Sequence, residues 1–262
     1  MKNNHKFDIN NIKSVQRRII IKMFKEYIDR IAQLTNFEKE DILNKKFLLE
    51  DDTNIKIYYA PHNEFINKQA KILIVGITPG WTQTQIAYKT ANQEIKKKNK
   101  MNEILKQCKY NSRFSGSMRK NLIDMLDQIK LNKKLNLQSS SELFEEGNNL
   151  MHTTSLIKYP VFINGKNYNG HNPEILKNTL LCNYINRYFI NEINELQNII
   201  IIPLGKAVEE VLTNLSNNSL IKNNYTILYG FPHPSGANGH RKEIFQENKK
   251  NLINIINNIN ID

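Results

Sequence analysis

The sequence contains only two cysteines, Cys108 and Cys182, among its 262 residues. Two thiols cannot build a disulfide scaffold, and they cannot supply a four-cysteine metal site within one chain. The sequence also lacks an apolar run of the ~20 residues that a membrane-spanning helix needs, and its start, MKNNHKFDIN, has no signal-peptide core. We therefore expect a soluble cytoplasmic protein without a membrane span.

Acidic residues are fewer than basic ones, because 25 Asp and Glu stand against 37 Lys and Arg and the formal net charge is +12. A basic surface of this size favours a polyanionic partner, nucleic acid first and an anionic membrane second. Lysine, asparagine and isoleucine are abundant along the whole chain, as in proteins from AT-rich genomes, in which lysine accumulates without a function. Charge alone therefore leaves the question of a nucleic-acid partner open.

Apolar runs that alternate with amphipathic segments indicate strands and helices from residue 71 onward. Strands are predicted at 71–76, 153–158, 198–203 and 225–229, with helices at 117–129, 173–196, 207–215 and 242–259. Apolar strands separated by helices are typical of a parallel sheet that is covered on both faces. We therefore expect an α/β fold, a three-layer α/β/α sandwich with a central parallel sheet of about four strands.

The first 60 residues are predicted to form an extension to this sandwich. Residues 11–34 have the spacing of an amphipathic helix, and 55–59 is a short strand candidate. We divide the chain into an N-terminal helical extension over 1–60, packed on the core, and a main domain over 61–262.

The carboxyl ends of the predicted strands bring four segments to one edge of the sheet, where ligands bind in folds of this class. These segments are 76–80 (GITPG), the residues around Ser155, Gly205 and the loop 230–241 (GFPHPSGANGHR). The glycine spacing of 76–80 does not fit a dinucleotide-binding turn, no Walker lysine follows it, and the chain has no G-x-S-x-G elbow. His233 lies between two prolines that stiffen its backbone. It is suited to donate a hydrogen bond to a bound molecule.

Five segments, in order along the chain, together resemble the motifs of the uracil-DNA glycosylase superfamily. They are 76-GITPG-80, 114-FSGSMRKNLIDML-126, 154-TSLIK-158, 203-PLGKAV-208 and 233-HPSGANGHR-241. Each motif is weak by itself, but five in the family's order are fairly specific. The resemblance covers roughly residues 71–245 and leaves out about the first 50.

The resemblance implies a monofunctional DNA glycosylase, which flips a base out of the DNA and hydrolyses its N-glycosidic bond to leave an abasic site. It implies that His233 donates to O2 of the departing pyrimidine, that Thr78 is a second catalytic residue, and that Phe114 stacks on the flipped base. The implied base contacts also include Gly76, Ile77, Pro79, Gly80 and Ser155. Candidate DNA contacts are Ser235, Asn238, His240, Arg241, Arg113, Arg119 and Lys120. We expect DNA rather than a membrane as the partner, no cofactor, and a monomer.

The chain departs from the family pattern at several positions. Thr78 stands where uracil-specific members often hold an aspartate or asparagine that positions water, and a hydroxyl is a poor base. Ser155 stands in place of the asparagine that reads the uracil edge, which argues against strict uracil specificity. The residues 236–238, Gly-Ala-Asn, replace the usual wedge. Tyr159 follows Lys158 where the iron–sulfur branch has a cysteine, so no iron–sulfur cluster is expected.

These departures leave several functions open. The leading hypothesis is excision of a modified or damaged pyrimidine, which includes a hypermodified phage cytosine in antiviral defence. Excision of uracil in DNA repair is the alternative within the class. Outside it stand a non-catalytic DNA-binding protein on the same scaffold and an enzyme that acts on free nucleotides.

Overall fold

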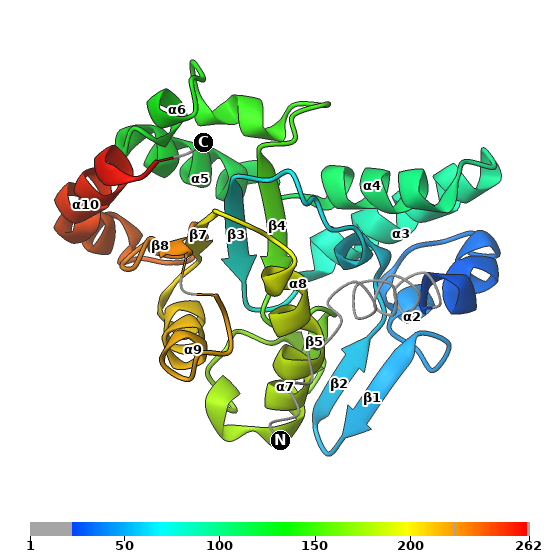
Figure 1. Ribbon diagram of the computed structural model, residues 1–262. Coiled ribbons are helices and arrows are strands. Elements are labelled where there is room, and N and C mark those ends of the chain that lie inside the picture. The colour runs from blue at the N-terminus through cyan, green and yellow to red at the C-terminus, as the bar shows by residue number, and fades with distance from the viewer. Residues whose placement is uncertain (1–22, 223, 261–262) are drawn as a thin grey trace, which may run out of the picture.

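The computed structural model describes residues 23–222 and 224–260, which form two sheets flanked by helices (Figure 1). The central sheet has the strand order β4-β3-β7-β8, and each neighbouring pair is parallel. Its strands are β3 (Ile72–Gly76), β4 (Met151–Ser155), β7 (Ile200–Pro203) and β8 (Thr226–Ile227). The predicted parallel sheet of four strands is therefore confirmed. Compared with the sequence prediction, β4 begins at Met151 rather than at 153, and β8 is shorter.

Helices cover both faces of the central sheet. Successive residues of a strand point to opposite faces, so each strand contributes side chains to the core on either side. From β3, Leu73 and Val75 enter one hydrophobic core, while Ile72 and Ile74 enter another. The second core includes residues of α5 (Gly116–Gln128), α6 (Leu131–Lys134) and α10 (Arg241–Asn258). The first includes residues of α3 (Trp81–Lys96), α4 (Met101–Ser112), α9 (Lys206–Asn217) and the helix at 23–32. The three-layer sandwich expected from the sequence is confirmed.

The remaining helices are short. The predicted helix over 173–196 is divided into η3 (Ile175–Lys177), α7 (Thr179–Tyr184), the π-helical segment η4 (Ile185–Phe189) and α8 (Ile190–Asn194). The others are α2 (Lys39–Ile42), η1 (Pro61–Glu64) and η2 (Ser140–Phe144). Within the described ranges, no helix has both the length and the apolar character needed to cross a membrane.

A second, antiparallel sheet joins the N-terminal segment to the main domain. Its order is β1-β2-β5-β6, formed by β1 (Leu48–Asp52), β2 (Ile55–Tyr58), β5 (Val161–Ile163) and β6 (Lys166–Asn167). The sequence predicted only β2 among these, and β2 pairs with β5 of the main domain. The first 60 residues thus contribute two strands as well as helices. Of the helix predicted at 11–34, residues 23–32 are helical, and 11–22 lie outside the described residues.

β4 is an end strand of the central sheet, and side chains from outside the sheet bind its carbonyl groups. Asn67 Nδ2 donates to the carbonyl oxygen of Met151 at 3.2 Å, and the buried Lys109 ammonium donates to that of Thr153 at 2.6 Å. Lys109 also donates to Asn63 Oδ1. These bonds hold η1 and the residues after it beside the outer edge of β4.

Replacing Lys109 with methionine tests how much this edge contributes to stability. The substitution keeps a long flexible side chain but leaves the Thr153 carbonyl and Asn63 Oδ1 without their buried donor. We expect the free energy of unfolding in urea to fall by ~1–3 kcal/mol. The control is Lys96→Met on α3, where the lysine is exposed. Equal losses of unfolding free energy in the two variants would contradict the role of the Lys109 hydrogen bonds in stabilising this edge.

Candidate active site

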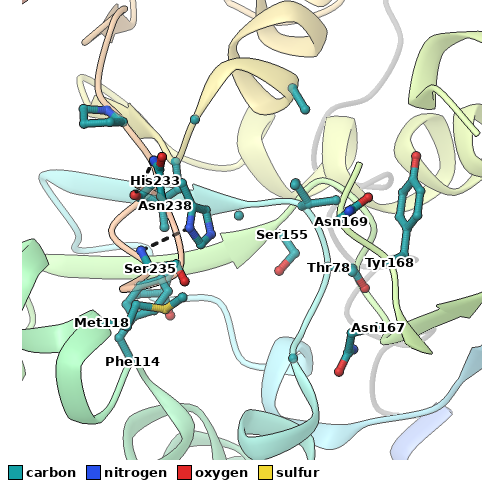
Figure 2. Close-up of a pocket in the computed structure, with 18 of the residues that line it drawn as sticks. Thr78, Phe114, Met118, Ser155, Asn167, Tyr168, Asn169, His233, Ser235 and Asn238 are labelled. Carbon is teal, nitrogen blue, oxygen red and sulfur yellow. Dashed lines mark hydrogen bonds between the residues drawn. The ribbon is translucent and has the colours of Figure 1, made fainter. Parts of the chain in front are cut away.

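A cavity of about 940 Å³ lies at the carboxyl ends of the parallel strands. The turn after β3, Ser155 at the end of β4, Gly205 after β7 and the loop after β8 all line it. The predicted site residues that line the cavity are Gly76, Ile77, Thr78, Gly80, Phe114, Ser155, His233, Ser235 and Asn238. Figure 2 draws His233 and Thr78 on opposite sides of Ser155. The topology therefore gathers segments that the sequence assigned to one rim.

The imidazole of His233 is held in one orientation by its own loop. The backbone N–H of Ser235 donates to His233 Nδ1 at 3.2 Å, drawn as a dashed line in Figure 2. Asn238 Nδ2 donates to the His233 carbonyl at 3.1 Å, and Asn121 Nδ2 donates to that of Pro234 at 2.9 Å. Burial lowers the pKa of His233, which favours the neutral ring. A neutral ring that accepts at Nδ1 carries its proton on Nε2, so His233 can donate to a ligand.

Gly205 allows α9 to begin directly against His233. Its φ of +90° and ψ of 170° belong to a region that is essentially limited to glycine. A Cβ at this position would lie 3.2 Å from the Cβ of His233. Gly205 N also donates to the carbonyl oxygen of Phe231 at 3.1 Å, and Glu209 Oε2 accepts from Gly230 N at 2.9 Å. The first turn of α9 and the His233 loop are thus bound to each other.

The hydroxyl of Thr78 makes two hydrogen bonds to the backbone. It donates to the Tyr159 carbonyl at 2.8 Å and accepts from Val161 N at 3.0 Å. The only proton of the hydroxyl is therefore used to fasten the turn to the start of β5. The catalytic role of Thr78 stays a prediction, and the geometry gives this side chain a structural task. Among the described residues that line the cavity, Glu209 carries the only carboxyl group.

Two amides of the 76–80 turn and its following helix are bound to side chains. Gln83 Oε1 accepts from Gly80 N at 3.1 Å, and Asn167 Oδ1 accepts from Trp81 N at 3.0 Å. Asn167 Nδ2 also donates to the Pro79 carbonyl at 3.3 Å. The resemblance implies that Gly76, Ile77, Pro79 and Gly80 contact the base, and a turn can do so through its backbone amides. Because Pro79 has no N–H and Gly80 N is bound, the amides of Ile77 and Thr78 are the better candidates.

Phe114 sits at the entry to α5, where two arginines fix its backbone. It is 7% exposed and packs in the core under α5. Arg119 Nε donates to the Phe114 carbonyl, and Arg119 Nη2 donates to that of Arg113 at 3.3 Å. Arg113 in turn donates to the carbonyls of Leu143 and Phe144 at 3.0 and 3.1 Å. Both arginines were proposed as phosphate contacts, which stays a prediction, whereas the structure uses them to position Phe114.

The other proposed DNA contacts lie at the mouth of the cavity or on the surface. Arg241 Nη1 donates to the Ser235 carbonyl at 2.7 Å, and Ser235 Oγ accepts from Ala237 N at 3.2 Å, so both shape the His233 loop. His240 and Lys120 are exposed and do not line the cavity. Their contacts with DNA stay predictions. In the part of the chain that the structure describes, no group of three or more His, Cys, Asp or Glu side chains could hold a metal ion.

Two parts of the cavity wall carry no sequence motif. One is formed by the end of β6 and the loop after it, which supply Asn167, Tyr168, Asn169 and His171. The other lies beyond the edge of β4 and supplies His62, Asn63 and Ser112. Sequence reasoning missed both, because these segments reach the cavity through the second sheet and through the side-chain bonds along β4. Neither route has a local pattern in the sequence.

Known proteins are similar to this chain over most of its length. The family model described as the Uracil DNA glycosylase superfamily matches residues 64–258. The chain is 43% identical over 230 residues to the uncharacterized protein YoxB of Bacillus subtilis (strain 168), a match that covers 87% of this chain and 90% of that protein. Among solved structures, wild-type SMUG2 of Pedobacter heparinus is similar with a TM-score of 0.43 and 12% identity, over 89% of this chain and 96% of that chain.

Gly205→Ala tests the close approach of α9 to His233. A side chain at φ +90° is strained and meets the His233 Cβ, so we expect the free energy of unfolding to fall by ~1–3 kcal/mol. The matched control is Gly236→Ala in the His233 loop, where the added Cβ would lie 3.7 Å from Ser117 Oγ, an ordinary contact. Urea unfolding compares the two. An alanine at 205 as harmless as the one at 236 would disprove the constraint.

Titration by NMR tests the state of the His233 ring. We expect its pKa to lie below the ordinary 6.5, because burial disfavours the imidazolium, and we expect the proton on Nε2 at neutral pH. Since the unfolded chain then binds this proton more readily than the folded chain, stability should fall as the pH drops below about 6.5. The spectrum of His233→Gln assigns the signal. A midpoint above 6.5, or a proton on Nδ1, would contradict this geometry.

Proposed function

The chain belongs to the uracil-DNA glycosylase superfamily, and on this premise we propose that it is a monofunctional DNA glycosylase that removes a modified or damaged pyrimidine. The observation that carries the proposal is the cavity that His233 lines together with the turn after β3, where the neutral ring has its Nδ1 bound and keeps Nε2–H for a ligand. The net charge of +12 suits a DNA partner.

Catalysis in this proposal rests on stabilising the departing base. As the bond between C1′ of the sugar and N1 of the pyrimidine breaks, its electron pair moves onto the base, and negative charge develops on O2. His233 Nε2–H donates to that oxygen, assisted by the amides of Ile77 and Thr78, in the manner of an oxyanion hole. Water then adds to C1′ and loses one proton to solvent, and the departing base anion takes up one proton, which leaves an abasic site and the neutral free base.

Water activation contributes little in this scheme. The hydroxyl of Thr78 donates its hydrogen bond to the Tyr159 carbonyl, and Glu209, the carboxyl group in the described cavity wall, accepts from Gly230 N. Neither is arranged as a strong general base. The rate therefore depends on the donor at His233 and on the orientation of the flipped base against Phe114.

The shape of the cavity supports a base larger than uracil. Ser155 is a small residue at the end of β4, and its partner on β3, Gly76, has no side chain. A Cβ added at Gly76 would lie 3.8 Å from Ser155 Oγ, at an ordinary contact distance. The volume of about 940 Å³ is near the upper end of the range for ligand pockets, which runs to about 1,000 Å³. A hypermodified cytosine of phage DNA meets these conditions, and its removal in the cytoplasm would serve antiviral defence.

A second candidate function is binding of DNA without catalysis. The observation that favours it is the engagement of Thr78 in two backbone bonds, together with a described cavity wall whose one carboxyl group, that of Glu209, accepts from Gly230 N. An assay for base release separates this candidate from a glycosylase.

The test is to incubate the protein with a panel of DNAs and to score abasic sites by alkaline cleavage. The panel holds unmodified DNA, DNA with uracil, and phage DNA with hydroxymethylated or glucosylated cytosine. Cleavage of only the modified DNA is the expected result. Cleavage of uracil DNA alone would indicate a repair enzyme. No abasic sites, together with tight binding of DNA, would favour the non-catalytic candidate.

His233→Ala removes the proposed donor to O2. We expect single-turnover base release to slow by about 10²–10³-fold, as for loss of one oxyanion-hole donor. The Kd for DNA should stay within about threefold, which is a change of less than 1 kcal/mol in the free energy of binding. The matched variant is His233→Gln, whose amide keeps an N–H donor and should retain more activity. Equal losses of binding and release in His233→Ala would argue against the role.

A further inference from the structure

The cavity continues past the base site to a polar end beyond β4. In the order of the sheet, the His233 loop follows β8, the 76–80 turn follows β3, and Ser155 ends β4. His62 and Asn63 belong to η1, which lies along the outer edge of β4, and both line the same cavity. His62 therefore stands at the opposite end of the cavity from His233.

Two side chains at this end have polar atoms without a partner. Within the described chain, neither His62 Nδ1 nor Thr154 Oγ1 makes a hydrogen bond, although His62 is only 3% exposed and Thr154 only 5%. Burial, and then the charges of Lys109 and Lys158, lower the pKa of His62 well below its usual range. The ring is therefore neutral, with one donor and one acceptor nitrogen. Buried polar groups without partners are rare in folded proteins. Both side chains line the cavity, so a rotation of either one would offer its polar atoms to a bound group.

The charges behind this end are balanced. Lys158 Nζ lies 3.0 Å from Glu64 Oε2, and Glu192 Oε1 lies 2.9 Å from His152 Nε2. With Lys109, whose pKa burial lowers to about 7, this buried cluster holds two lysines against two glutamates and has no excess of positive charge. Neither a phosphate nor an ammonium would gain from such surroundings, because either one would be buried without a counter-charge. The polar end is suited to a neutral group with hydroxyls.

The chemistry of the ring decides which part of the base reaches this end. In a pyrimidine, C5 lies directly across the ring from C2, so a base whose O2 faces His233 points C5 away from it. We propose that His62 and Thr154 form a specificity subsite that hydrogen-bonds a neutral, hydroxyl-bearing substituent on C5 of the flipped pyrimidine. The inference rests on the proposed function for the orientation of the base. It assigns substrate selection to His62, which lies outside the five sequence motifs, and to Thr154, the first residue of the 154–158 motif.

The test compares substituents that differ by one hydroxyl. The probes are DNA oligonucleotides with a single 5-methylcytosine or 5-hydroxymethylcytosine, and a second pair with thymine or 5-hydroxymethyluracil. Base release by the wild type and the Kd of the slow variant His233→Ala are measured on each pair. We expect the hydroxymethyl base to be preferred by about tenfold in at least one pair, the size of one hydrogen bond. A ratio within twofold in every pair, in both measurements, would overturn the subsite.

Variants of His62 assign the preference to this side chain. His62→Leu keeps the bulk and removes both nitrogens, so we expect the ratio between hydroxymethyl and methyl probes to fall to about one. His62→Gln keeps a donor and an acceptor and should retain most of the preference. Thr154→Val, which changes a hydroxyl for a methyl group, supplies a second reading if His62→Leu fails to fold. An unchanged ratio in His62→Leu, or in Thr154→Val when His62→Leu is unfolded, would overturn the proposal.

The two measurements separate this inference from the proposed function. If the wild type releases no base but binds the hydroxymethyl probes more tightly, and His62→Leu abolishes that preference, the glycosylase proposal falls and the subsite stands. If bases are released without regard to the hydroxyl, the glycosylase stands and the subsite falls.

Discussion

The carbonyl groups along the edge of a sheet need hydrogen-bond donors, and the way this protein meets that need along β4 determines much of its architecture. Asn67 and Lys109 supply the donors as side chains. They keep η1 against the edge, and η1 follows directly on β2. The second sheet is therefore attached beside the central one, and η1 supplies a polar wall of the cavity. If another strand had paired with β4, it would have taken the place of this wall.

The same kind of bond holds the two loops that face a ligand. Arg119 holds the Phe114 carbonyl, and Asn121, from the same helix α5, holds that of Pro234. Arg241, at the start of α10, holds the carbonyl of Ser235. Side chains of long helices thus fix loop backbones that have few bonds of their own. A site built from loops acquires the rigidity of the helices behind it, which favours a fixed orientation of catalytic groups.

The sequence was sufficient for the central sheet and for the segments at its rim, because apolar strands and ordered motifs are local patterns. It indicated that His233 can donate a hydrogen bond to a bound molecule, and in the structure the Ser235 amide fixes the other ring nitrogen. It did not reveal β1, β5 and β6, which are short and partly polar, or the cavity wall at His62. It also could not foresee that Thr78 and Arg119 bind backbone carbonyls. Such contacts join residues through the tertiary fold and leave no spacing to detect.

The contacts between α9 and the His233 loop have a consequence for how sequences of this kind can diverge. Gly205 has no room for a side chain against His233, and Glu209 binds the amide of Gly230. A substitution at the start of α9 therefore alters the loop even though about 25 residues separate the two in the chain. The two motifs should be inherited as a single unit, with changes in one accepted only alongside changes in the other.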